Sequence, residues 1–194
     1  MGRLEPGLRL PVLIVPLPAA ARSIALGLFC LLSPLALAME TVYLEPADFL
    51  ARYVPGCRQQ ALWLNAEVKA EVERLVDRPF PGVRVRYCSD GPRTAWILDE
   101  IGKTEPITTG IVVEGGRVEL VRVLVFRESR GGEVHREAFV RQYDDARLNG
   151  DDTLDRSIDG ITGATLSVYA LSRQVKLALY LDEVARQSAA QASP

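Results

Sequence analysis

The sequence predicts an α+β fold: a twisted, largely antiparallel sheet with a helical N-terminal lead and a C-terminal helix packed on it. Apolar and polar residues alternate along short segments between residues 83 and 127, which is the period of half-buried strands. Apolar residues then recur at spacings of three to five after Thr165, as in a helix that buries one face. Neighbouring strands joined by short turns pair antiparallel, so the closing helix is expected to cover such a sheet.

Residues 1–38 have the pattern of an export signal. Arg22 precedes an apolar run, and Ala36-Leu37-Ala38 has the small-x-small form of a signal peptidase site. The run is shorter than the roughly 20 residues that span a bilayer, which favours a removable signal peptide. An uncleaved N-terminal membrane anchor is the alternative. We therefore expect an extracytoplasmic protein, located in the periplasm or on the outer face of the cytoplasmic membrane.

Residues 39–194 are numerous enough for one domain with its own hydrophobic core. Three arginines and one glutamate give residues 1–38 a net charge of +2, so their removal changes the formal charge from −2 to −4. This mildly acidic balance, without any basic run, argues against a nucleic-acid partner.

The first elements expected after residue 38 are helices. Residues 47–54 and 59–76 have helical periodicity, and the second segment places Leu64, Val68 and Val72 on one face. Trp63 and Trp96 each lie in an apolar element, where a tryptophan is expected in the core.

The next elements expected are strands, over residues 83–87, 94–98, 107–114 and 117–127. Gly115-Gly116 is expected to join the last two segments as a hairpin. Within the last segment, we expect Val121, Val123 and Val125 to face one side of the sheet.

The most informative segment is residues 159–165, Asp-Gly-Ile-Thr-Gly-Ala-Thr, which precedes the C-terminal helix. Thr162 or Asp159 is the expected N-cap, which places the Thr165 hydroxyl in the first turn. Unpaired N–H groups and the helix dipole favour an anion there by about 0.3 to 1 kcal/mol per charge. The segment therefore predicts a phosphate group held beside Thr165, and an ordinary turn and cap is the alternative.

These seven residues resemble the flavinylation motif of the FMN-binding domain family: Asp, two or three variable residues, Ser or Thr, Gly, Ala, Thr. The family includes the covalent-FMN subunits of the sodium-pumping NADH:quinone oxidoreductase and of the Rnf complexes. In those subunits a magnesium-dependent flavin transferase uses FAD and joins FMN by a phosphoester to the last threonine. The resemblance implies that Thr165 carries FMN here.

The resemblance covers roughly residues 101–181, and residues 102–110 are similar to the start of the family's flavin-binding sheet. Residues 128–133, Glu-Ser-Arg-Gly-Gly-Glu, are similar to a Glu-Thr-Pro-Gly-Leu-Gly loop that helps to hold the flavin. Arg130, Gly132 and Glu133 depart from that loop, which argues against close equivalence to the ion-pumping complexes. From its charge, Arg130 is expected to pair with the FMN phosphate or with the reduced ring, and a solvated loop arginine is the alternative.

The expected organisation is a signal peptide or anchor over residues 1–38, a helical lead and first strand over 39–90, an FMN-binding domain over 91–187 and a disordered tail over 188–194. The cofactor-binding residues that the resemblance implies are Thr165, Asp159, Gly160, Thr162, Gly163, Ala164, Glu128, Ser129, Arg130 and Gly131.

No catalytic residue and no metal site are expected. An acidic stretch lies between residues 144 and 155, but Arg147 and Arg156 occupy positions where a calcium loop needs ligands. His135 is the single histidine, which excludes a multi-histidine metal site. Cys57 and Cys88 are the cysteines outside residues 1–38, and an oxidising compartment permits a disulfide between them, with free thiols as the alternative.

The resemblance implies an extracytoplasmic electron-transfer protein, an electron carrier or redox-complex subunit rather than a stand-alone enzyme. Its implied partners are a flavin transferase for maturation and a membrane-bound electron donor or redox complex. No Gly-x-Gly-x-x-Gly fingerprint of a nicotinamide site is present. The alternatives are a flavin-free binding or assembly module of a membrane redox complex, and a periplasmic flavin reductase that acts on a soluble acceptor.

Overall fold

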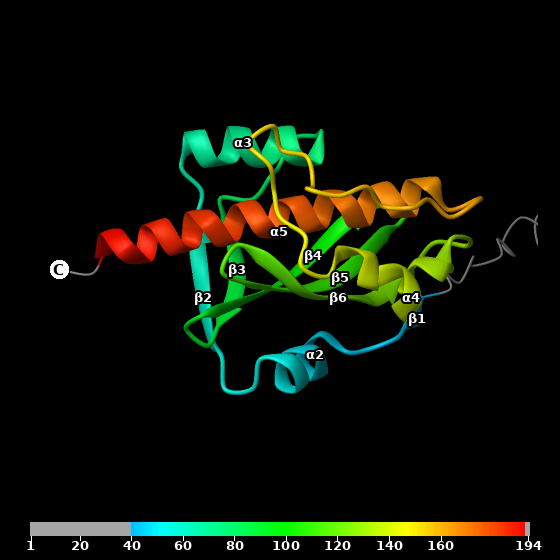
Figure 1. Ribbon diagram of the computed structural model, residues 1–194, viewed down its shortest axis with the longest axis horizontal. Coiled ribbons are helices and arrows are strands. Elements are labelled where there is room, and N and C mark those ends of the chain that lie inside the picture. Colours follow the sequence, from blue (N-terminus) through cyan, green and yellow to red (C-terminus); the bar gives the residue numbers. More distant parts are fainter. Residues whose placement is uncertain (1–39, 193–194) are drawn as a thin grey trace, which may run out of the picture. The chain divides into compact units, whose positions relative to one another are not determined.

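The structure, a computed structural model, describes residues 40–192, so the expected signal segment over residues 1–38 lies outside the described part. The sheet order is β1-β6-β5-β4-β3-β2, and every neighbouring pair is antiparallel (Figure 1). The strands are β1 (Thr41–Val42), β2 (Arg58–Trp63), β3 (Arg84–Ser89), β4 (Arg93–Ile101), β5 (Pro106–Glu114) and β6 (Arg117–Phe126). The predicted α+β class is confirmed.

The helices are α2 (Pro46–Tyr53), α3 (Ala66–Val76), α4 (Glu137–Val140) and α5 (Thr165–Ala192), and short 3-10 turns η2 (Gly132–His135) and η3 (Arg141–Tyr143) flank α4. None of the helices between residues 40 and 192 combines the length and the apolar character that a membrane span requires.

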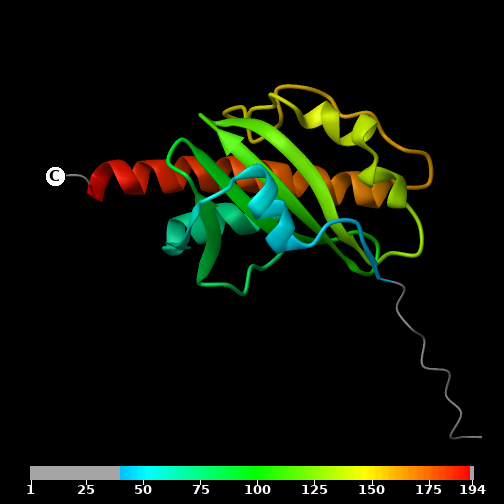
Figure 2. The same ribbon diagram turned by 90° about the horizontal axis from the view of Figure 1, so that it is seen from below.

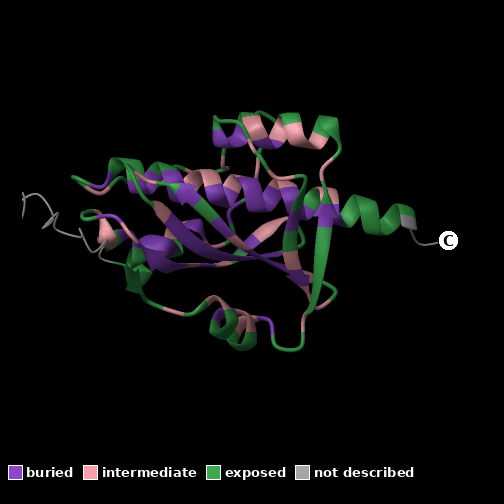
Figure 3. Ribbon diagram, turned by 180° about the vertical axis from the view of Figure 1, so that it is seen from behind, coloured by how far each residue is buried: buried purple, intermediate pink, exposed green. Residues whose placement is uncertain are grey.

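Each face of the sheet has its own hydrophobic cluster. Helix α5 lies along one face with α3 beside it, while α2 lies against the opposite face (Figure 1). On the α2 face the Phe49 ring packs directly on Gly110, where an added Cβ would lie 2.7 Å from ring atoms. Strands β5 and β6 are the most buried part of the sheet, whereas the C-terminal end of α5 is exposed (Figure 3).

Two buried polar side chains fix the register of α5 on strand β4. Gln174 donates hydrogen bonds from Nε2 to the carbonyl oxygens of Leu98, at 2.9 Å, and Ile107, at 2.7 Å. Further along the helix, buried Asp182 accepts a hydrogen bond from the Thr94 hydroxyl at 2.8 Å. Eight helical residues rise about 12 Å, and four strand residues span about 13 Å, so the two attachments match along antiparallel elements.

Strands β5 and β6 form the predicted hairpin. Gly115 and Gly116 have φ values of +58° and +75°, as a tight two-residue turn requires. The expectation for the valines is wrong at Val125. Val121 and Val123 pack in the α5-facing cluster, but Val125 packs in the α2-facing cluster. The pairing register shifts at this point, and the bulge inserts one residue and so reverses the alternation of faces.

The expected helix over residues 59–76 is wrong in its first half. Residues 58–63 form strand β2, which pairs along β3, and the helix begins only at Ala66. Asn65 is the N-cap, because its side chain accepts the Val68 N–H at 2.8 Å. Trp63 consequently lies on an edge strand and is 66% exposed, whereas Trp96 is fully buried as expected.

Residues 188–192 differ from the expected disordered tail over residues 188–194, because α5 continues to Ala192, and residues 193–194 lie outside the described part. The Ser188 hydroxyl donates to the Val184 carbonyl at 2.9 Å, and Gln187 donates to Glu183 at 3.1 Å. Alanine and glutamine are good helix formers, so local preference sustains the helix where no sheet lies beneath it.

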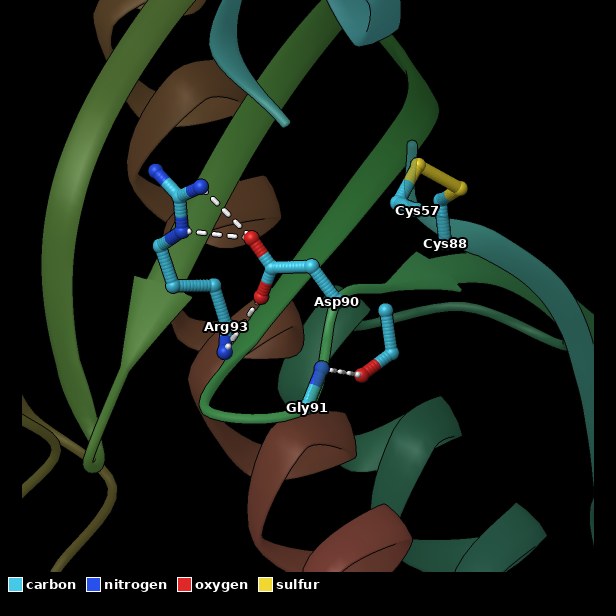
Figure 4. Close-up of a disulfide and its surroundings, with 6 residues drawn as sticks. Cys57, Cys88, Asp90, Gly91 and Arg93 are labelled. Carbon is cyan, nitrogen blue, oxygen red and sulfur yellow. Dashed lines mark hydrogen bonds and ion pairs between the residues drawn. A yellow bond between two sulfur atoms is a disulfide. The ribbon is translucent and has the colours of Figure 1, made fainter. Parts of the chain in front are cut away.

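Cys57 and Cys88 form a disulfide with a Cα–Cα separation of 5.5 Å (Figure 4). This bond joins the segment after α2 to strand β3 and resolves the choice that the sequence leaves open. The β3–β4 turn beside it is held by Arg93, whose Nε donates to Asp90 at 2.8 Å (Figure 4).

A double Cys57→Ser and Cys88→Ser variant is expected to lose about 2 to 4 kcal/mol of unfolding free energy. The bond closes a loop over a sequence separation of 31 residues, and its loss increases the entropy of the unfolded chain. Urea unfolding of the variant and of the oxidised wild type measures the difference. Reduced wild type is the control, and equal stability of all three proteins would contradict the expectation.

Candidate functional site

The segment that precedes α5 exposes a threonine hydroxyl at the start of the helix. Gly163 has a φ of +83°, and the following Ala164 is buried. The Ala164 carbonyl accepts the Val168 N–H at 3.0 Å, which makes it the first acceptor of the helix. The expected N-cap, Thr162 or Asp159, is therefore wrong. Thr165 is the first helical residue and is exposed to solvent.

The remaining motif residues lie further from the helix. Asp159 and Gly160 are exposed, and the Asp159 backbone N–H donates to the Gln142 side chain at 2.7 Å. Thr162 is also exposed and forms a turn with Gly163. The approach to Thr165 is thus an open loop tied to the neighbouring helical turns through Gln142.

The segment after β6 packs directly against the first turn of α5. Gly131 has a φ of +86°, and a Cβ added there would lie 2.7 Å from the Ser167 hydroxyl and 3.2 Å from the Ala164 Cβ. Figure 2 shows the start of α5, in orange, beside the yellow-green segment that follows β6. Two segments that are about thirty residues apart in sequence are therefore brought together.

A cleft of about 630 Å³ opens at this junction, and we call it the main cleft. Its volume lies within the range of about 300 to 1,000 Å³ that is common for small-molecule sites. Its lining residues are Lys103, Glu128, Ser129, Arg130, Gly163, Ala164, Thr165, Leu166 and Ser167. Lys103, Leu166 and Ser167 are absent from the set that the sequence predicts.

A second hollow of about 530 Å³, the side cleft, shares Ser129, Arg130 and Gly163 with the main cleft. Gly131 and Thr162 line the side cleft rather than the main one, and Asp159 and Gly160 line neither. The other side-cleft residues are Tyr43, Gly132, Glu133, His135 and Arg136. The His135 ring stacks on Tyr43 with 4.1 Å between ring centroids, and its Nδ1 lies 2.5 Å from the Gly132 carbonyl oxygen.

Two cations in the main cleft are available to a ligand. Within residues 40–192, neither the Lys103 ammonium nor the Arg130 guanidinium forms an ion pair or a hydrogen bond. The N–H groups at the start of the 28-residue helix α5 add positive potential to the same cleft. This combination favours an anionic ligand.

Among the described residues, the carboxylate of Glu128 forms no ion pair with these cations, and its hydrogen bonds go to the β4–β5 turn. Its Oε1 accepts the backbone N–H groups of Lys103, Thr104 and Glu105, the last two at 2.6 and 2.9 Å. Its Oε2 accepts the Thr104 hydroxyl at 3.2 Å. Burial alone would raise the pKa of Glu128, but these donors outweigh it and hold the pKa below its ordinary value.

No group of three or more His, Cys, Asp or Glu side chains gathers as a metal site in the described part of the chain. The acidic segment between residues 144 and 155 instead forms local contacts. Asp152 pairs with Arg74 of α3, and Asp151 accepts the Thr153 hydroxyl at 2.8 Å.

The sequence signal for Lys103 is weak. Lys103 lies in the segment that resembles the start of the family's flavin-binding sheet. None of the neighbouring residues in the sequence indicates that the Lys103 side chain lines the main cleft. That placement depends on Glu128, which lies 25 residues away and binds the turn.

Acid is expected to destabilise the protein partly through Glu128. Because the fold lowers this pKa, the carboxylate contributes stability above its unfolded pKa of about 4.3 and loses that contribution as the pH falls through the lower folded value. Thermal unfolding of wild type and Glu128→Gln between pH 6 and pH 2 measures the difference. The two curves should converge as the pH falls, and parallel curves would contradict this role.

A Gly131→Ala variant is expected to lose about 1 to 3 kcal/mol of stability, because alanine is strained at this φ and its Cβ would collide with Ser167. Urea unfolding measures the loss. Gly150→Ala is the matched control, since no atom lies within 4 Å of its added Cβ and its φ is not positive. Equal losses in the two variants would show that the loop does not press on α5.

Residues 102–180 match the family described as the FMN-binding domain. The matched range contains every residue that lines the main cleft. No curated protein and no solved structure matches the chain. The match confirms the family that residues 159–165 predict, and it does not identify a particular redox complex.

Proposed function

We propose that this chain, which belongs to the FMN-binding domain family over residues 102–180, is an extracytoplasmic electron-transfer protein that carries FMN on Thr165 through a phosphoester. The observation that carries the proposal is the position of Thr165. The residue is exposed, begins a 28-residue helix and lines a cleft that contains two cations without a partner among residues 40–192. A phosphodiester at this hydroxyl would carry one negative charge in that positive field.

The choice of hydroxyl follows from exposure and position. Ser167 also lines the main cleft, but it is buried against Gly131 and closed to a second protein. Thr162 is exposed but lines the side cleft. Ser129 and Thr165 both combine access from solvent with a place in the wall of the main cleft, and of these two only Thr165 begins helix α5.

Attachment requires an external flavin transferase. A threonine hydroxyl is a weak nucleophile at neutral pH, and His135 lines the side cleft instead of the main cleft. In the reaction, the Thr165 oxygen attacks the flavin-side phosphorus of FAD. A new oxygen–phosphorus bond forms, the pyrophosphate bond breaks, AMP leaves, and a base of the transferase takes the proton.

Bound FMN supplies the capacity to accept and release one or two electrons. The chain would hold the FMN in the main cleft, and one residue of the cleft wall, Leu166, is exposed to solvent. Leu166 and Tyr169 lie one turn apart on α5 and are 46% and 58% exposed. This exposed apolar pair is suited to contact with a membrane-bound electron donor or a redox complex.

The disulfide between Cys57 and Cys88 supports an extracytoplasmic location, because such bonds persist in oxidising compartments. The export pattern of residues 1–38 points in the same direction.

Coexpression with a flavin transferase in a periplasm is expected to add the mass of one FMN less one water to the wild type. Intact mass and in-gel flavin fluorescence of denatured protein measure the attachment. The added mass should be lost in Thr165→Ala and kept in Thr165→Ser, which retains a hydroxyl. Thr153→Ala, in a loop outside the main cleft, is the surface control. An unmodified wild type, or flavin that persists in Thr165→Ala, would contradict the proposal.

A further inference from the structure

The two unpaired cations occupy different parts of the main cleft. Arg130 lines both clefts together with Gly163, so it lies beside the turn that leads to Thr165. Lys103 comes from the β4–β5 turn and lines the main cleft alone. The arginine therefore lies where the two clefts meet, whereas the lysine reaches the main cleft from a different element, the β4–β5 turn.

An FMN attached to Thr165 has two places where negative charge occurs. The phosphodiester would be next to the threonine, and uptake of two electrons and one proton would leave a negative charge on the ring. The electrons come from the membrane-bound donor. Two places of negative charge on the ligand would thus meet two cations that come from different elements of the cleft wall.

We propose that the Lys103 ammonium stabilises the negative charge of the reduced flavin ring, and that Glu128 is the positioning residue that holds Lys103 at the cleft. This inference rests on the proposed function, because it assumes that FMN occupies the main cleft. The Lys103 ammonium would donate a hydrogen bond to the ring. Arg130 and the start of α5 are left to bind the phosphate.

The hydrogen bonds of Glu128 explain how Lys103, a residue in a turn, is held in a defined position. Three successive backbone N–H groups, from Lys103 to Glu105, converge on one carboxylate oxygen. The Gly102 N–H donates to the Glu105 carbonyl at 3.1 Å and closes the turn. A Cβ on Gly102 would lie only 3.0 Å from Glu128 Oε1, so the turn is wrapped tightly around the carboxylate.

Because backbone donors occupy the carboxylate, Glu128 fixes the lysine backbone without forming an ion pair with its side chain. The N–H donors of the ammonium therefore remain available to a ligand in the cleft. A direct Glu128–Lys103 ion pair would have occupied those donors and brought the opposing charge closer, which would weaken the interaction with a reduced ring.

The test is the reduction potential of the attached flavin, followed by its absorbance during a redox titration. In Lys103→Met, the equilibrium constant for two-electron reduction of the ring is expected to fall about tenfold. This change lowers the reduction potential by ~30 mV. Lys103→Arg should retain most of the wild-type potential. Lys69→Met removes the same charge from α3, outside the cleft, and should leave the potential unchanged.

The role of Glu128 is tested by a double-mutant cycle. Glu128→Gln should lower the potential in the same direction and accelerate hydrogen exchange at residues 103–105. In the Glu128→Gln/Lys103→Met double variant, the shift should be no larger than in Lys103→Met alone, because Glu128 acts through the lysine. Additive shifts would overturn the positioning role.

Intact mass of every variant separates this inference from the proposed function. A flavinylated Lys103→Met protein with the wild-type potential overturns the role of Lys103 and leaves the flavin carrier intact. A wild type without attached FMN contradicts the attachment, and the same titrations are then made with free FMN. A wild type that binds no FMN, attached or free, overturns both proposals.

Discussion

The attachment of α5 to strands β4 and β5 is the constraint on which the rest of the site depends. Gln174 binds carbonyl oxygens of both strands, and Asp182 binds Thr94 further along β4. Both side chains are buried, so a shift of the helix by one residue would leave polar groups without partners in the core. This penalty fixes the position of Thr165 at the end of the sheet where β5 begins.

The antiparallel sheet supplies the other walls of the cleft. Ile107 at the start of β5 pairs with Phe126 at the end of β6, so the β4–β5 turn and the segment after β6 emerge at the same end. Glu128 reaches from that segment to the turn, and Gly131 brings the same segment onto α5. One short loop therefore brings the lysine, the arginine and the helix start into the wall of one cleft.

The elements that stabilise the domain are largely separate from this site. The disulfide lies beside the α2-facing cluster, to which Phe49 and Val112 contribute, whereas α5 covers the opposite face. Removal of the disulfide is therefore expected to lower the stability of the domain without changing the residues that line the main cleft. Glu128 is different, because the same hydrogen bonds stabilise the turn and place Lys103.

The sequence by itself determined the class of fold, the strands between residues 93 and 126, the Gly115-Gly116 turn and the family of the motif that ends at Thr165. These are features of local periodicity, turn chemistry and short motifs. Only the tertiary structure decided that residues 58–63 form a strand, that Val125 faces α2 and that Lys103 lines the cleft. Pairing with β3 makes residues 58–63 a strand, the β5–β6 bulge turns Val125 toward α2, and Glu128, 25 residues away, binds the turn that carries Lys103. Such long-range contacts leave no periodic signal in the sequence of the residues that they position.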